Sequence, residues 1–244
     1  YVALRSRFDK EARVDDKYFH LTLLCENEVG WRNLIKLATK AHLEGFYYRP
    51  RVDRELLKEH HEGLIALSGC PAGEAPRKIL NNDLDGAEEK IKEYADIFGA
   101  DNFFLEIGHH PNIPEVAKIN REMKKLAEKT GLPLVATQDI HYAKHEDADY
   151  HDILLAVQTG NKLSDDDRLT LKIDDFSMSS QEEMAEAFKD VPEALENTVK
   201  IAQRCNVVLN LNQIMLPNFP LPEKEKSAIE YLRKLVGERL PGRF

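Results

Sequence analysis

An aspartate and a histidine two residues apart are the strongest local signal for chemistry in this sequence. Asp139 and His141 lie in the run Thr137-Gln-Asp-Ile-His141, directly after an apolar stretch that predicts a buried strand. Because the carboxyl ends of parallel strands meet at one edge of a sheet, both side chains could reach a single metal ion there. The alternative is that Asp139 caps the following turn and His141 lies on the surface.

A cysteine and a second histidine stand near other predicted strands. Cys70 follows a strand, after Leu67-Ser-Gly, and thiolates bind zinc well, although an isolated cysteine is more commonly a small buried hydrophobe. We expect Cys70 and Asp139 to lie at the same edge of the sheet. His20 opens a strand, where a histidine is usually a hydrogen-bonded core residue, and this place predicts the opposite end of a simple barrel.

Two further residues are candidates for contacting a substrate. His110 follows a predicted strand within His109-His-Pro111 and is a candidate substrate contact at the same edge. Arg51 ends the segment Gly45-Phe-Tyr-Tyr-Arg-Pro-Arg51, whose aromatic rings and two arginines suit phosphate or base binding. The alternative for this segment is a packed loop with solvated arginines.

An alternation of strands and helices must position these residues. Apolar runs predict buried strands, and apolar side chains at helical spacing predict the helices between them. The predicted strands cover residues 19–25, 63–67, 102–107 and 132–137, and the predicted helices cover 28–41, 72–80, 86–98, 114–130, 146–157, 192–205 and 227–238, with another beginning after Ser180. This order predicts an α/β fold with parallel strands, either an open doubly wound sheet or part of a βα barrel.

The ends and faces of two helices can also be predicted. Asn27 is the expected N-cap of the helix over 28–41, and Gly131 is the expected stop of the helix over 114–130. The first of these helices is expected to bury one apolar stripe, made of Trp31, Leu34, Ile35 and Ala38.

Composition excludes several classes of protein. The 244 residues include 34 Lys and Arg against 43 Asp and Glu, a formal net charge of −9, which argues against a surface that binds nucleic acid throughout. A metal site built from carboxylates and imidazoles could still act on phosphate esters. No apolar run approaches the roughly 20 residues of a membrane span, and three cysteines fit a reducing compartment. We therefore expect a cytoplasmic protein without membrane contact.

A set of segments, in order along the chain, resembles one known family. It is the PHP (polymerase and histidinol phosphatase) domain of the bacterial DNA polymerase III alpha subunit, and the resemblance runs from about Tyr1 to Pro222. The segments are His20-Leu-Thr-Leu-Leu24, Leu43-Glu-Gly-Phe-Tyr-Tyr-Arg-Pro-Arg-Val-Asp53, Gly63-Leu-Ile-Ala-Leu-Ser-Gly-Cys70, Val135-Ala-Thr-Gln-Asp-Ile-His-Tyr142, Val157-Gln-Thr-Gly160 and Ile201-Ala-Gln-Arg-Cys-Asn206.

The resemblance implies a distorted (βα)7 barrel that holds up to three divalent metal ions, zinc, manganese or iron, at one edge. Metal-competent members act there as 3′–5′ exonucleases. Four of the nine ligand positions of the family match residues of this chain whose side chains are able to bind a metal, and Asp139 and His141 would also be the catalytic pair. The four are His20, Cys70, Asp139 and His141.

The other five ligand positions of the family would lie before Tyr1. We therefore expect residues 1–215 to be a PHP domain that lacks its first strands, followed by a helical segment. Residues 216–244 would be a connector, spaced by Pro217, Pro220 and Pro222, and the start of a polymerase part. Such an isolated fragment should bind at most one metal ion tightly, lack nuclease activity and self-associate.

The resemblance implies a replicative DNA polymerase, a nucleotidyltransferase whose PHP domain contributes metal-dependent phosphodiester hydrolysis. Its partners would be primer-template DNA and other holoenzyme subunits, such as a proofreading subunit and the sliding clamp. One alternative is a catalytically silent module that braces the polymerase and docks those subunits. The other is a free-standing phosphoesterase of the histidinol phosphatase type.

Overall fold

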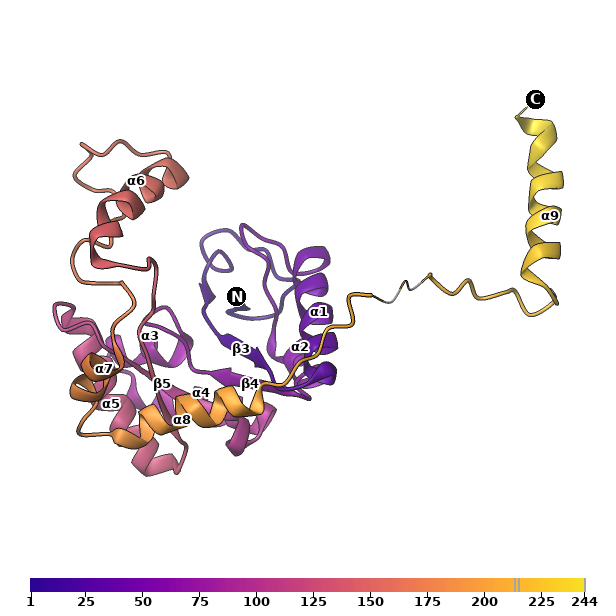
Figure 1. Cartoon of the computed structure of the whole chain (residues 1–244). Coiled ribbons are helices and arrows are strands. Elements are labelled where there is room, and N and C mark those ends of the chain that lie inside the picture. The colour runs from indigo at the N-terminus through magenta and orange to yellow at the C-terminus, as the bar shows by residue number, and fades with distance from the viewer. Residues whose placement is uncertain (213, 215, 244) are drawn as a thin grey trace. The chain divides into compact units, whose positions relative to one another are not determined.

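A four-stranded sheet is the centre of the fold (Figure 1). The computed structural model describes residues 1–212, 214 and 216–243. The sheet contains β3 (Thr22–Cys25), β4 (Leu64–Leu67), β5 (Phe103–Gly108) and β6 (Leu134–Thr137), in that order. The expected α/β fold is confirmed, and the described strands form an open sheet rather than a closed barrel.

The strands are not all parallel. β4, β5 and β6 are parallel neighbours, whereas β3 is antiparallel to β4, with Thr22 opposite Leu67 and Cys25 opposite Leu64. The prediction of a wholly parallel sheet is therefore wrong for β3. Two helices and an extended loop, rather than one crossover helix, connect β3 with β4, so the chain returns to the sheet in the opposite direction.

The first predicted strand is interrupted. Residues 18–25 form two short strands, because β2 (Tyr18–Phe19) pairs antiparallel with β1 (Val2–Ala3) instead of joining β3. His20 lies between them and forms an isolated bridge with Gly73. The break at His20 moves its backbone away from the sheet ladder and toward the loop that follows β4.

The helices largely follow the predicted ranges. Asn27 caps α1 by accepting a hydrogen bond from the Gly30 N–H, and Gly131 ends α5 in the left-handed conformation, both as expected. The helices of this part are α1 (Glu28–Leu43), α2 (Arg54–Glu59), α3 (Glu74–Leu80), α4 (Leu84–Phe98), α5 (Pro114–Thr130), α6 (Ala148–Thr159), α7 (Gln181–Ala187) and α8 (Pro192–Arg204), with 3-10 turns η1 (Ala100–Asn102) and η2 (His145–Asp147).

The buried face of α1 differs from the predicted stripe. Its buried residues are Gly30, Asn33, Leu37 and Ala41, while Ile35 of the expected stripe is exposed. The reason is close packing, because Gly30 lies against the backbone of Gly63 and Asn33 donates a hydrogen bond to the Glu62 carbonyl. Small and polar residues fill the buried face of α1. The spacing of apolar residues alone therefore predicts the wrong rotation of the helix about its own axis.

The core has a layer on each face of the sheet, because neighbouring residues of a strand point to opposite sides. One face packs on α1, α3, α4 and α5 through Leu64, Ala66, Phe103, Leu105, Leu134 and Ala136. The other face meets Ile201 of α8 through Ile65, Leu67, Phe104 and Val135. Glu106 and Thr137 fall on this second face by the same alternation.

Contacts divide the chain into two compact units, Tyr1–Val208 and Leu209–Phe244. The expected boundary after residue 215 falls on a residue outside the described ones. The second unit contains the three prolines of the expected connector and then α9 (Ala228–Arg239) and η3 (Leu240–Gly242). None of the helices in the described ranges is long and apolar enough to cross a membrane.

Candidate metal centre

Three side chains from separate parts of the chain meet at one edge of the sheet. The Sγ atom of Cys70 lies 3.4 Å from Nδ1 of His20. Asp139 joins them in lining a hollow of about 300 Å³, which Glu106 also lines. Cys70 and Asp139 therefore share one edge, as expected from their places after β4 and β6.

His20 reaches this edge because β3 is reversed. In a parallel sheet the beginning of a strand lies far from the carboxyl ends of its neighbours, but antiparallel pairing puts the beginning of β3 beside the end of β4. The backbone N–H of His20 donates to the Ala72 carbonyl at 3.1 Å, which fixes the residue against the loop after β4. The expectation that His20 lies at the opposite end is therefore wrong.

Gly69 allows the chain segments of His20 and Cys70 to approach one another. Its φ is +87°, a conformation that residues with a side chain rarely adopt. A Cβ atom at this position would lie 2.6 Å from the His20 carbonyl oxygen. Glycine is required here both by the backbone conformation and by the contact.

Burial keeps the Cys70 thiol and the His20 imidazole neutral. Burial is the main cause that raises the pKa of Cys70, and the carboxylate of Asp139 raises it further. Burial likewise lowers the pKa of His20. A neutral imidazole is ready to bind a metal ion, whereas the thiol must first release its proton, which a divalent cation promotes.

Asp139 follows β6 in a left-handed backbone conformation, with φ of +51°. Aspartate tolerates this region better than most residues do, yet it is uncommon outside glycine. Strained backbone of this kind is found frequently at functional sites. The conformation turns the chain sharply at the end of β6 and leaves the Asp139 side chain exposed beside Cys70.

His141 does not join the other three residues. It is exposed, its Nδ1 lies 2.6 Å from the Asp139 carbonyl oxygen, and its ring packs edge-on against Phe176 and His151. If Nδ1 carries the proton and donates it to that carbonyl, Nε2 is left with the lone pair that binds metals. The structure thus orients the imidazole without bringing it to the hollow.

The donor types suit a divalent cation, although the donors do not enclose one. In the residues that the structure describes, no group of three or more His, Cys, Asp or Glu side chains is arranged to hold a metal ion. His20, Cys70 and Asp139 offer nitrogen, sulfur and oxygen, a mixture that zinc accepts. A buried carboxylate oxygen of Glu106 at the same edge also has no hydrogen-bond partner.

Comparison with protein-family models matches residues 2–110 to the PHP domain. The matched range contains His20, Cys70 and Glu106, which all line the hollow. Residues 2–110 belong to the PHP domain family.

Similar proteins extend the likeness beyond the matched PHP range. Alpha subunits of DNA polymerase III from Treponema pallidum and Thermus aquaticus are 44% and 46% identical to the chain, over 100% and 97% of its length. The alpha subunit from Borreliella burgdorferi is 41% identical over 100% of the chain. The chain covers 21%, 20% and 21% of these proteins, so it spans about a fifth of the length of the curated relatives it matches.

Arg51 has a structural place in the PHP domain. Its side chain is fully buried and donates to four backbone carbonyls, those of Arg7, Asp9, Asp15 and Gly45. Its guanidinium therefore has no face open to a phosphate. The contacts favour a packed loop, although Arg51 is buried in it rather than solvated as that alternative had expected.

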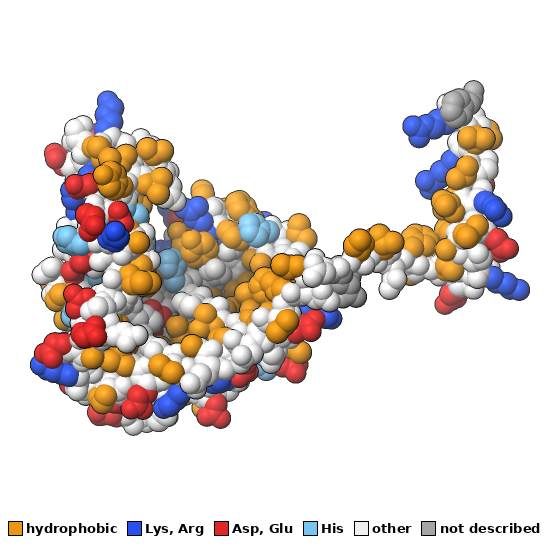
Figure 2. All heavy atoms as spheres, in the orientation of Figure 1, with side chains coloured by type: hydrophobic (Ala, Val, Ile, Leu, Met, Phe, Trp, Pro, Cys, Tyr) orange, Lys and Arg blue, Asp and Glu red, His pale blue; other side chains and the backbone are white. Residues whose placement is uncertain are grey.

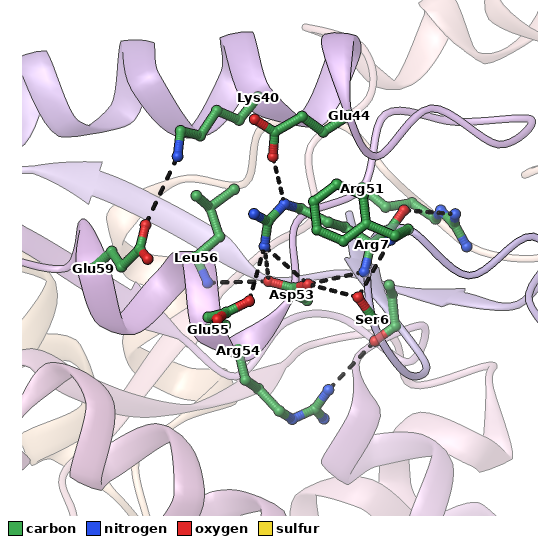
Figure 3. A network of polar contacts seen from close by, with 12 residues as sticks. Ser6, Arg7, Lys40, Glu44, Arg51, Asp53, Arg54, Glu55, Leu56 and Glu59 are labelled. Carbon is green, nitrogen blue, oxygen red and sulfur yellow. Dashed lines mark hydrogen bonds and ion pairs between the residues drawn. The ribbon is translucent and has the colours of Figure 1, made fainter.

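A second arginine strengthens the same region. Figure 3 shows Arg7 between the carboxylates of Glu44 and Asp53, at 2.7 and 2.9 Å. Asp53 also caps α2 by accepting a hydrogen bond from the Leu56 N–H. Together with Arg51, this network fixes the long loop before β2, which has little secondary structure of its own.

His110 is buried behind the metal edge. Only 6% of it is exposed, and its ring stacks on Phe176 with the centroids 4.2 Å apart. Neither ring nitrogen makes a hydrogen bond of normal geometry, although the backbone of Gln138 lies near the ring, and burial is the main cause that lowers the pKa of the imidazole. Contact with a substrate would therefore require an opening at this point.

Sequence reasoning missed Glu106. It lies within the apolar strand β5, and burial raises the pKa of its carboxyl group. Its Oε1 atom accepts a hydrogen bond from Thr137 Oγ1 at 2.8 Å. The available signal was a single acidic residue within the run Phe103-Phe-Leu-Glu-Ile107, because an unpaired carboxylate is rarely buried without a function.

Proposed function

We propose that this chain is the PHP part of a replicative DNA polymerase alpha subunit, and that this part hydrolyses phosphodiester bonds as a metal-dependent 3′–5′ exonuclease. The meeting of His20, Cys70 and Asp139 at one edge of the sheet is the observation that carries the proposal. The similarity to alpha subunits over almost the whole chain supports the assignment to a DNA-directed DNA polymerase.

The residues of this chain would hold and orient the metal ions. His20 would bind through a ring nitrogen and Cys70 through its sulfur. Asp139 would bind through a carboxylate oxygen and His141 through a ring nitrogen, so this chain would supply four ligands. Bound divalent cations, zinc, manganese or iron, supply Lewis acidity and lower the pKa of water that attacks phosphorus. The left-handed turn at Asp139 would present its carboxylate to the ions.

The proposed subunit would act on primer-template DNA in the cytoplasm. Its partners would be the other polymerase III holoenzyme subunits, among them a proofreading subunit and the sliding clamp. The acidic surface of this part agrees with DNA being held chiefly elsewhere in the subunit.

A second candidate function is a structural module without catalysis. The buried network of hydrogen bonds around Arg51 and Asp53 favours it. In this case the domain would brace the polymerase and dock other subunits.

Asp139→Asn in the full-length alpha subunit separates the two candidates. We expect metal-dependent exonuclease activity on primer ends to fall about 100-fold or more, because the substitution removes a charged ligand. Nucleotide incorporation should remain close to that of the unsubstituted protein, since the polymerase chemistry lies outside this chain.

The matched control is Asp96→Asn, at an exposed position of α4 away from the metal edge. It should change neither activity. Exonuclease activity that survives Asp139→Asn would show that Asp139 is not a catalytic ligand and would favour the structural module.

A further inference from the structure

Glu106 is a buried acid with an unused oxygen. The side chain is 9% exposed, and its Oε2 atom is fully enclosed and has no hydrogen bond of normal geometry, although the backbone N–H of Gly69 lies near the carboxylate. Its other oxygen is fixed by the Thr137 hydroxyl. An unpaired buried carboxylate oxygen lowers the stability of a fold. A fold that keeps such an oxygen is therefore expected to pair it with a group outside the chain, such as water or an ion.

The position of Glu106 shows where that partner would be. Glu106 lines the open hollow of about 300 Å³ together with His20, Cys70 and Asp139. It also lines a smaller cavity of about 30 Å³, which shares Cys70 and Asp139 with the hollow. A cavity of this size has room for one water molecule.

The charges at this edge are also unbalanced. Asp139 and Glu106 line the same hollow as the Cys70 thiol. In the described part of the chain, neither Glu106 nor Asp139 forms an ion pair with a lysine or arginine. Two carboxylates beside a thiol, without a basic partner, attract a cation.

We propose that Glu106 positions the divalent cation held by Cys70 and Asp139, with its Oε2 atom accepting a hydrogen bond from the hydration shell of that cation. This inference rests on the proposed metal-dependent function and adds a residue from β5 to the site. Thr137 Oγ1 then orients the carboxylate, so β5 and β6 act together behind the ligands.

Glu106→Gln in the full-length alpha subunit tests the role. Glutamine keeps the shape of the side chain and the acceptor for Thr137, but removes the negative charge. We expect the affinity for Zn²⁺ and for Mn²⁺, each measured by competition with a chelator, to fall about 10- to 100-fold. Retained nucleotide incorporation would show that the subunit is folded.

The matched control is Glu122→Gln on α5. Glu122 is also 9% exposed, but its carboxylate is already paired with Arg121 and Lys125. This variant should bind both metals as the unsubstituted protein does, because the acid is distant from the metal edge and has its own partners.

Thr137→Val is a second variant, for use if Glu106→Gln does not fold. Valine keeps the shape of threonine but removes the hydroxyl that orients Glu106, so we expect metal affinity to fall roughly threefold to tenfold. Unchanged affinity in this variant would contradict the proposed positioning.

The outcomes separate this inference from the proposed function. Loss of metal in Asp139→Asn with unchanged affinity in Glu106→Gln would overturn the role of Glu106 and leave the metal centre standing. An unsubstituted subunit that binds neither metal would overturn the proposed function and this inference with it.

Discussion

Gly69 determines how closely His20 can approach Cys70. Gly69→Ala would place a methyl group 2.6 Å from the His20 carbonyl oxygen and require φ of +87° from an alanine. We expect the free energy of unfolding of the isolated chain to fall by about 2–4 kcal/mol, from strain and the contact together. Urea unfolding followed by circular dichroism measures it.

Gly131→Ala isolates the effect of strain. Gly131 also has a positive φ, of +73°, but a Cβ atom there meets nothing within 4 Å. This substitution should cost only about 1 kcal/mol. Equal losses in the two variants would show that the contact with His20 contributes nothing.

The position of a site residue could be predicted where the neighbouring sequence alone determines it. Cys70 and Asp139 each follow a strand of the parallel part, and this alone brings them to one edge. His20 could not be placed, because its location depends on the direction of β3. The unused oxygen of Glu106 depends on packing between strands, so the sequence offered only an acid in an apolar run.

At the level of elements, an ion pair between the buried Asp152 and the partly buried Arg168 ties α6 to the loop that follows it. Both terminal nitrogens of Arg168 donate to the Asp152 carboxylate at 2.6 Å, and these bonds are the main cause that lowers the pKa of Asp152 to about 2. Thr170 donates to the same carboxylate at 2.7 Å. The pair should hold residues 161–170 against the helix.

Asp152→Asn should loosen that loop in a pH-dependent way. A lowered pKa in the folded state means that the carboxylate stabilises the fold fully above about pH 4, and that this contribution disappears as the pH falls toward 2. We expect a loss of about 1 kcal/mol at pH 5, shrinking by pH 2.5, in unfolding measured at both values.

Asp149→Asn provides the comparison. Asp149 pairs with Lys172 at 2.6 Å, but its carboxylate is exposed to water. Exposed pairs contribute little, so unfolding should change only slightly at either pH. A loss as large as that of Asp152→Asn would show that burial of the Arg168 pair is unimportant.

Elements were predictable where short signals mark their ends. Pro114 and Gly131 define α5, and its range of 114–130 was predicted correctly because proline suits the first turn and glycine the left-handed stop. The buried face of α1 was not predictable, since backbone contact between Gly30 and Gly63 outweighs apolar spacing. Strand direction is similarly invisible, because alternation gives the face of a strand and not its orientation.

At the level of the whole molecule, an apolar surface lies beside an open edge of the sheet. A hollow of about 340 Å³ is lined by side chains of α1 and of the segment around β3, among them Leu21, Leu23, Leu34 and Leu37. Figure 2 shows hydrophobic side chains gathered on the visible face of the unit Tyr1–Val208. In the described sheet β3 pairs with β4 alone, so its other edge has free backbone groups.

We expect the isolated 244-residue chain to self-associate through this surface. Sedimentation velocity should show species larger than a monomer, whose share grows with protein concentration. Thr22→Lys, at the exposed first residue of β3, should reduce that share because a lysine on an open edge opposes strand pairing. Thr39→Lys, on the exposed side of α1, should not, and a monomer at all concentrations would contradict the expectation.

The reversal of β3 also determines where the gene can gain or lose codons. A one-residue insertion within β3 would shift the register of one part of the strand by about 3.4 Å and turn the side chains of that part to the other face. If the part after the insertion keeps its pairing with β4, the segment with His20 shifts, and His20 and Cys70 move apart although neither codon has changed. An insertion in the exposed loop 161–167 leaves the strand register untouched, so length variation among descendants of this gene should collect there and avoid residues 20–25.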